Sequence, residues 1–172
     1  MGDRVLAIPE VTLVLGGTRS GKSGFAQRLV EGLPGPWAYL ATGSGTDSDM
    51  ATRIAAHRDR RGAGWETIEA GAALAPALIH TPDQVALVDS LGTWVAAHHD
   101  FAVDVDALTK ALAVRVAATV IVSDEVGLGV HPSTEVGRQF RDALGLVNQA
   151  VASVAGAVWL VVAGRGLRLE SP

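Results

Sequence analysis

The sequence predicts an α/β fold with a mostly parallel central sheet flanked by helices, and three observations support this prediction. Short runs rich in β-branched residues alternate with segments of helical pattern, an order typical of α/β domains. Several of these runs, such as "VALVDS" and "TVIVSD", are mostly apolar, which suits strands covered on both faces. A glycine-rich stretch, "GGTRSGKS", joins the first run to the first helical segment, as in phosphate-binding α/β proteins.

Each element follows from its local pattern. The expected strands are Val11–Leu15, Trp37–Thr42, Glu66–Glu69, Val85–Ser90, Thr119–Ser123 and Ala157–Ala163. The expected helices are Lys22–Glu31, Asp49–Arg61, Ala72–His80, Asp104–Ala118 and Thr134–Val154. The closing "VVAGRGLRLE" predicts a turn into one more short strand, antiparallel at an edge of the sheet. No repeat or linker interrupts the pattern, so we expect one domain, residues 1–172, with residues 1–10 as an N-terminal extension.

The composition indicates an ordered globular protein and argues against several functions. Of the 172 residues, 48% are hydrophobic and 19% are charged, so the chain can bury a substantial core. The net charge of −4 argues against binding to nucleic acid or to a membrane surface. No apolar run is long enough for a membrane span, and the first residues do not resemble a signal peptide. With no cysteine, the chain has no disulfide or thiolate site, and we expect a cytoplasmic protein.

The stretch Gly16–Ser23 matches the phosphate-loop (P-loop) pattern G-x-x-x-x-G-K-[ST] at every fixed position. Glycines let backbone N–H groups turn toward phosphate oxygens, and the N-terminus of the following helix adds positive potential. We expect Lys22 to reach the terminal phosphates and the Ser23 hydroxyl to bind Mg²⁺. Lys22 and Lys110 are the only lysines among 14 basic residues, so a slim ammonium in the loop suggests a steric requirement. The sequence therefore predicts a protein that binds a nucleoside triphosphate.

A magnesium site of this kind usually includes a carboxylate from the end of a neighbouring strand. Asp89 closes the apolar run "VALVD", and we favour it for this role. In the alternative interpretation, Asp89 caps the helix that follows. Asp124 and Glu125 follow the next predicted strand, and spacing alone does not rank the three carboxylates.

A candidate nucleophile lies in the segment "RIAAHRDRR", where Arg58, Arg60 and Arg61 follow His57. On a helix, Arg53, His57 and Arg61 share one face. Because nearby cations disfavour protonation, we expect His57 to have a lowered pKa and to be a neutral, nucleophilic imidazole. Arginines in this position can clamp phosphate oxygens. The alternative is a solvated helix end with a surface histidine.

These motifs occur in one order with suitable gaps: "GGTRSGKS", "YLATG", "RIAAHRDRR", "LVDSLGTW" and "VSDEVGLGVHPSTEVGRQFRDALGLVNQ". From Leu13 to Leu169 the chain resembles the bifunctional adenosylcobinamide kinase/adenosylcobinamide-phosphate guanylyltransferase family of cobalamin biosynthesis. Many nucleotide-binding proteins share the phosphate loop, whereas the histidine helix and the long last segment are far more specific. The resemblance implies a fold similar to RecA-type ATPases and a homotrimer.

The resemblance also implies two reactions. A nucleoside triphosphate, ATP or GTP, phosphorylates the aminopropanol hydroxyl of adenosylcobinamide. GMP then passes from GTP through a GMP–histidine intermediate to the cobinamide phosphate, giving adenosyl-GDP-cobinamide. His57 matches the guanylylated histidine, and Ser23 and Asp89 are the implied Mg²⁺ ligands. The implied nucleotide-binding residues are Gly16, Gly17, Thr18, Arg19, Ser20, Gly21, Lys22, Ser23, Ala41, Thr42, Gly43, Arg58, Asp59, Arg60, Arg61, Glu69 and Asp89.

The chain departs from the family pattern after Asp89, where Gly92 stands in place of an expected threonine and Thr93 follows one position later. Two other functions remain open on the sequence alone. One is a single-activity ATP-dependent small-molecule kinase in which His57 is structural, and the other is a nucleotide-binding switch without transfer activity. Polar residues of the last long helix are candidates for the corrinoid site or a subunit contact: Arg138, Gln139, Arg141, Asp142, Asn148 and Gln149.

Overall fold

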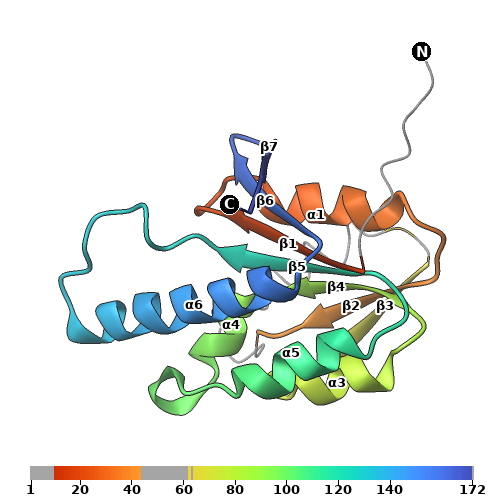
Figure 1. Cartoon of the computed structure of the whole chain (residues 1–172), viewed down its shortest axis with the longest axis horizontal. Coiled ribbons are helices and arrows are strands. Elements are labelled where there is room, and N and C mark those ends of the chain that lie inside the picture. Colours follow the sequence, from red (N-terminus) through yellow and green to blue (C-terminus); the bar gives the residue numbers. More distant parts are fainter. Residues whose placement is uncertain (1–9, 44–61, 63, 172) are drawn as a thin grey trace.

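The described part of the chain forms a seven-stranded sheet with helices on both faces (Figure 1). The computed structural model describes residues 10–43, 62 and 64–171. The strands are β1 (Val11–Gly16), β2 (Trp37–Ala41), β3 (Trp65–Glu69), β4 (Val85–Asp89), β5 (Thr119–Asp124), β6 (Ala157–Val162) and β7 (Arg165–Leu169). The helices are α1 (Lys22–Glu31), α3 (Leu74–His80), α4 (Leu91–Ala96), α5 (Val105–Ala113), α6 (Glu135–Val154) and the 3₁₀ turn η1 (His99–Phe101).

The strand order is β3-β2-β4-β5-β1-β6-β7, and all neighbouring strands are parallel except β6 and β7. The chain leaves β1 toward β2 on one side and later adds β6 on the other. The carboxyl end of β1 therefore lies at a switch point, where open α/β sheets bind their ligands. The predicted fold class, a mostly parallel sheet flanked by helices, is confirmed.

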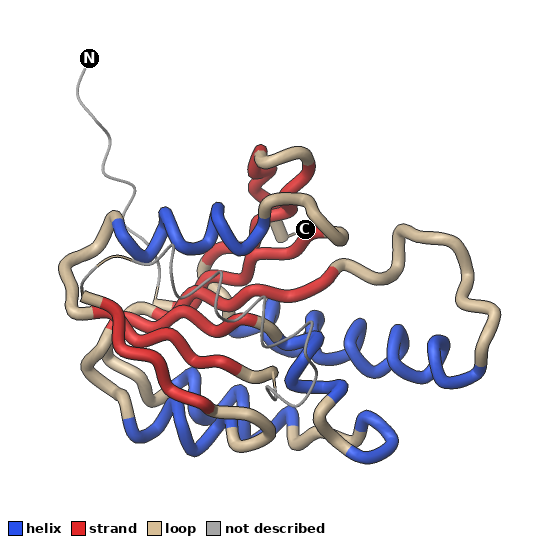
Figure 2. The backbone as a smooth tube through the Cα atoms, turned by 180° about the vertical axis from the view of Figure 1, so that it is seen from behind, coloured by secondary structure: helices blue, strands red, loops and turns tan. Residues whose placement is uncertain are grey.

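Two hydrophobic layers hold the helices on the sheet. Helix α1 covers one face, and α3, α4, α5 and α6 cover the other (Figures 1 and 2). Ala26 and Val30 of α1 are fully buried against the first face. Leu78, Leu108 and Leu144 represent α3, α5 and α6 in the larger cluster on the second face. Both faces of the central strands are thus buried, which explains their continuously apolar runs.

The predicted strands agree with the structure to within one residue at each end, and the final edge strand is antiparallel as expected. Helix α1 has the predicted bounds, while α6 begins one residue and α3 two residues later than expected. The predicted helix Asp49–Arg61 lies outside the described residues. One further helix, α4, was absent from the predicted set because it has only six residues. Its N-cap is Ser90, which forms a capping box with Thr93, so the alternative in which Asp89 caps this helix is wrong.

Helix α5 is shorter than predicted, since it ends at Ala113 and not at Ala118. The chain leaves the helix so that the Arg115 side chain can enter the protein, where the residue is 4% exposed. Its guanidinium donates five hydrogen bonds, among them to the carbonyls of Leu78, Thr81 and Gln84. Burial lowers the pKa of Arg115 to about 10, although Asp83 opposes the shift, so the group remains charged at neutral pH. The sequence did not indicate that Arg115 is buried in this way, because the number of arginines does not distinguish one position from another.

Candidate active site

The phosphate loop, residues 17–21, joins the carboxyl end of β1 to the N-terminus of α1. Its turn is closed by a hydrogen bond from Ser20 N to Gly17 O at 3.2 Å. Gly21, the N-cap of α1, has a left-handed φ of 88° that favours glycine. Residues 17–19 are exposed, and a cavity of about 470 Å³ opens beside the loop. This open ring of backbone at a helix N-terminus is suited to phosphate.

The turn between β6 and β7 supports the loop from outside. Gly164 N donates a hydrogen bond of 2.7 Å to Ser20 O. The two backbones pass so closely that a Cβ on Gly21 would lie 3.1 Å from Gly164 Cα. The final hairpin therefore braces the loop, a role that its sequence alone did not predict.

The Lys22 side chain lies across the loop. Its ammonium pairs with Asp124 at 2.7 Å and also donates to the carbonyl of Gly17 at 3.3 Å. The Lys22 side chain is only 13% exposed, whereas the Asp124 side chain is 33% exposed. Because a lysine ammonium has three donors, the Lys22 group can bridge the loop and β5 in this position.

The structure distinguishes the three candidate carboxylates. Asp124 at the end of β5 pairs with Lys22. Glu125 accepts hydrogen bonds from two backbone N–H groups of its own loop, at 2.8 and 3.0 Å. Asp89, at the end of β4, accepts a hydrogen bond from the Tyr39 hydroxyl at 3.3 Å, and the peptide bond after it is cis. The carboxylate that pairs with the loop lysine is therefore Asp124, while Asp89 lies on the next strand.

Gly92 explains one departure from the expected family pattern. It is buried in the first turn of α4, directly against the Asp124 carboxylate. A Cβ at position 92 would overlap a carboxylate oxygen of Asp124. Glycine at this position thus leaves room for the Asp124 side chain beside Lys22. The hydroxyl of the adjacent Thr93 accepts from the Ser90 N–H and so completes the capping box of α4.

The predicted nucleotide turn, Ala41–Gly43, follows β2 at the same edge of the sheet. The Thr42 side chain is fully buried and does not face solvent. Its hydroxyl donates to the carbonyl of Ser90 at 2.7 Å and accepts from the Ser90 N–H at 2.9 Å. Thr42 thereby joins the end of β2 to the end of β4. Because the Thr42 side chain is buried, a nucleotide could contact Thr42 only through its backbone atoms.

The strand register places further predicted site residues at the carboxyl edge of the sheet, where the phosphate loop also lies. Ala41 is aligned with Glu69 of β3 on one side and with Asp89 of β4 on the other. Gly16 is aligned with Asp124. The predicted residues His57, Arg58, Asp59, Arg60 and Arg61 lie outside the described residues, so their roles stay predictions.

Asn148 of α6 holds the backbone that carries Asp124. Its carbonyl oxygen accepts from the buried Ser123 hydroxyl at 2.6 Å, and its amide donates to the Asp124 carbonyl at 3.1 Å. The sequence offered one signal for this role, because Asn148 lies beside Val147 and Val151 on the buried side of an amphipathic helix. A polar side chain in such a position requires partners.

Known proteins are similar to this chain over most of its length. A family model described as cobinamide kinase / cobinamide phosphate guanyltransferase matches residues 12–169. The chain belongs to this family. The protein "Bifunctional adenosylcobalamin biosynthesis protein CobU" of Salmonella typhimurium is 35% identical, over 92% of this chain and 98% of the relative. The corresponding CobP protein of Pseudomonas aeruginosa is 36% identical, over 92% and 96% of the two chains. The predicted family and enzyme class, a kinase that is also a guanylyltransferase, are confirmed.

Solved structures of low sequence identity share the fold of this family member. The flagellar accessory protein FlaH of Methanocaldococcus jannaschii has a TM-score of 0.55 at 15% identity, covering 95% of this chain and 80% of its own. An ATPase of a bacterial type III secretion system has a TM-score of 0.52 at 12% identity, covering 89% and 51%. At these identities the likeness shows the fold alone. Among the described residues, no helix has the length and apolar character of a membrane span.

Proposed function

We propose that this protein phosphorylates adenosylcobinamide and then transfers GMP from GTP to the product through a covalent bond to His57. In the first reaction, the acceptor hydroxyl attacks the γ-phosphorus, the bond to the nucleoside diphosphate breaks and the hydroxyl proton leaves. In the second, a nitrogen of His57 attacks the α-phosphorus of GTP and expels pyrophosphate. The cobinamide phosphate then attacks the guanylyl phosphorus, which releases the imidazole and gives adenosyl-GDP-cobinamide.

The observation that carries this proposal is the position of Lys22 across an exposed phosphate loop, in a chain of this family. Both reactions displace a phosphate-bearing leaving group, and both therefore need stabilisation of negative charge. The backbone N–H groups of residues 17–21 and the Lys22 ammonium can supply it. Lys22 would exchange its contact with Asp124 for the phosphates of the bound nucleotide.

Magnesium fits the same edge through oxygen ligands. In the described part of the chain, no group of three or more histidine or acidic side chains surrounds a potential metal position. Mg²⁺ commonly binds through one or two protein oxygens together with nucleotide phosphates. The Ser23 hydroxyl and the Asp89 carboxylate are the oxygen donors that we propose, and the ion would neutralise charge on the phosphates.

His57 suits covalent transfer because a phosphoramidate is readily cleaved once the other ring nitrogen is protonated. The arginines that follow it can hold phosphate oxygens in forked geometry. The motif match supports this role. We also infer from the family resemblance that the protein forms a homotrimer, which light scattering would measure as three times the 17.7 kDa chain.

The two activities are tested separately with γ-labelled nucleotides and with preformed acceptor phosphate. We expect label from ATP or GTP to appear on adenosylcobinamide, and unlabelled adenosylcobinamide phosphate to become adenosyl-GDP-cobinamide when GTP is supplied. A single-activity kinase would perform the first reaction alone, and a nucleotide-binding switch would perform neither. Comparing ATP with GTP in the first assay identifies the preferred phosphate donor.

A further inference from the structure

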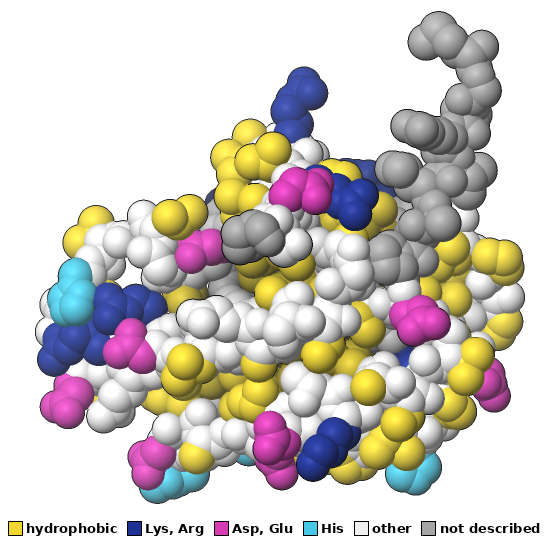
Figure 3. All heavy atoms as spheres, viewed as in Figure 1, with side chains coloured by type: hydrophobic (Ala, Val, Ile, Leu, Met, Phe, Trp, Pro, Cys, Tyr) yellow, Lys and Arg dark blue, Asp and Glu magenta, His cyan; other side chains and the backbone are white. Residues whose placement is uncertain are grey.

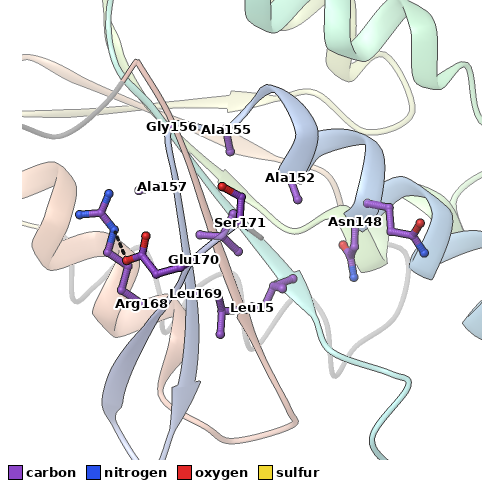
Figure 4. Close-up of a pocket in the computed structure, with 12 residues that line it drawn as sticks. Leu15, Asn148, Ala152, Ala155, Gly156, Ala157, Arg168, Leu169, Glu170 and Ser171 are labelled. Carbon is purple, nitrogen blue, oxygen red and sulfur yellow. Dashed lines mark ion pairs between the residues drawn. The ribbon is translucent and has the colours of Figure 1, made fainter.

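Two neighbouring cavities lie along α6, on the face of the sheet opposite α1. The first has a volume of about 370 Å³ and lies between α6, β1 and the β6–β7 hairpin (Figure 4). The second has a volume of about 580 Å³ and lies between α6 and the loop after β5. Both are of the size typical of small-molecule sites. They share Leu15, Asn148 and Gln149 and so form one elongated hollow, which we call the α6 trough.

The first part of the trough has an apolar lining. Leu15, Val158 and Leu169 contribute from the sheet, and Ala152 and Ala155 contribute from the helix side (Figure 4). Val158 and Leu169 are direct neighbours in the β6–β7 register. Alanines at the helix leave open the volume that larger side chains would fill. Figure 3 shows that apolar side chains also gather at the surface over the β6–β7 hairpin.

The charged groups of the trough are locally compensated. Arg168 lies 3.7 Å from Glu170, and Arg141 lies 2.8 Å from Asp142. The Glu125 carboxylate is already hydrogen-bonded by backbone N–H groups. Each arginine that lines the trough therefore has a carboxylate beside it, and with Glu125 the charged side chains of the trough carry no net positive charge. This balance argues against a second nucleotide in the trough.

The polar groups of the trough include an amide side chain, that of Gln149, which can form hydrogen bonds with uncharged polar groups of a ligand. Both ends of the Asn148 side chain already bond to β5. Gln149 is exposed, and within the described residues its side chain makes no hydrogen bond. A carboxamide offers one acceptor and two donors, the complement of another carboxamide.

The trough also adjoins the phosphate loop. The cavity beside residues 17–20 shares Glu125 with the second part of the trough. That cavity has an apolar side as well, formed by Leu128, Leu160 and Val162. A ligand that is apolar at one end and receives phosphate at the other can therefore span from α6 to the loop.

We propose that the α6 trough binds the corrin body of the acceptor, an apolar macrocycle edged with uncharged carboxamide arms. The aminopropanol arm would extend past Glu125 toward the phosphate loop, and Gln149 would pair with a carboxamide arm. This inference rests on the proposed function, which supplies the identity of the acceptor. It places the corrin body of the acceptor against one face of α6.

Two substitutions test the trough. Ala152→Phe fills it, so we expect the Kd of adenosylcobinamide phosphate to rise roughly tenfold or more. Gln149→Ala removes one exposed amide, and the loss of one hydrogen bond should raise this Kd about three- to tenfold. Equilibrium dialysis with detection by corrinoid absorbance measures both values. Covalent labelling of each variant by GTP needs no acceptor, and we expect it to be unchanged.

Ser153→Phe is the matched control, since Ser153 is exposed on α6 and lines neither cavity. If Ala152→Phe does not fold, the Kd of Gln149→Ala for adenosylcobinamide phosphate tests the proposal. Unchanged acceptor affinity in the folded trough variants overturns the proposal, as does a change of sedimentation mass without a change of affinity, which would show that a second copy covers the trough. A wild-type protein that neither accepts GMP nor modifies cobinamide contradicts the proposed function itself.

Discussion

The Lys22 ammonium lies 2.7 Å from the Asp124 carboxylate, so the strand next to β1 holds the cation of the phosphate loop. Asn148 fixes the backbone carbonyl of Asp124, and Gly92 leaves space for its side chain. Four elements, α1, α4, α6 and β5, thus meet around one ion pair. The pair sets the position from which Lys22 can move to a bound triphosphate.

Replacing Lys22 should weaken nucleotide binding without unfolding the protein. Lys22→Ala removes one charge-assisted contact, worth about 1.5–3 kcal/mol, so we expect GTP to bind roughly 10- to 100-fold more weakly. Titration calorimetry measures the change. Lys110→Ala is the matched control, because Lys110 is the other lysine of the chain and lies exposed on α5. Equal affinities of the two variants for GTP would show that Lys22 does not contact the nucleotide.

Gly92→Ala should disturb the same ion pair from the side of α4. The added methyl group meets the Asp124 carboxylate in a buried turn, so we expect a loss of about 1–3 kcal/mol of unfolding free energy and weaker GTP binding. Denaturant unfolding measures the first effect. Gly145→Ala in α6 is the control, since no neighbouring group lies within 4 Å of a methyl group at that position, and alanine should stabilise that helix by about 0.5–1 kcal/mol. A Gly92→Ala protein as stable as wild type would contradict the assigned contact.

Thr42→Val should reduce stability, because it removes the two buried hydrogen bonds of the Thr42 hydroxyl with the N–H and carbonyl of Ser90, which then have Thr93 and the backbone of α4 as their partners. A hydrogen bond contributes about 0.5–1.5 kcal/mol, and thermal unfolding should show a corresponding fall in Tm. Thr67→Val in β3 is the control, since the Thr67 hydroxyl makes no hydrogen bond within the described residues. Unchanged stability together with lost GTP affinity would instead place the Thr42 hydroxyl on the nucleotide.

Arg115→Lys should be more damaging than its conservative chemistry suggests. Lysine cannot reproduce the forked guanidinium that reaches the carbonyls of Leu78, Thr81 and Gln84. We expect a loss of about 3–5 kcal/mol of unfolding free energy, the range for breaking buried charged contacts. Arg28→Lys, on the exposed side of α1, should change it little. Comparable unfolding midpoints for the two variants would show that the Arg115 network does not stabilise the fold.

The sequence predicted the elements well because most strands are buried on both faces and therefore read as apolar runs, as in "TVIVSD" of β5. It predicted the phosphate loop because that pattern is local. The pairing of Lys22 with Asp124 depends on β5 lying beside β1, an order that spacing along the chain does not contain. The end of α5 was misplaced for a similar reason, since two of the partners of Arg115, Thr81 and Gln84, lie more than thirty residues away along the chain.

The central claim, that GMP is carried on His57, is tested most directly with GTP labelled at the α-phosphate. Wild-type protein should retain acid-labile, base-stable label and release it as adenosyl-GDP-cobinamide when adenosylcobinamide phosphate is added. His57→Ala should retain no label although it still binds GTP at the phosphate loop. Equal labelling of wild type and His57→Ala, or no labelling of a wild-type protein that binds GTP, would contradict the account.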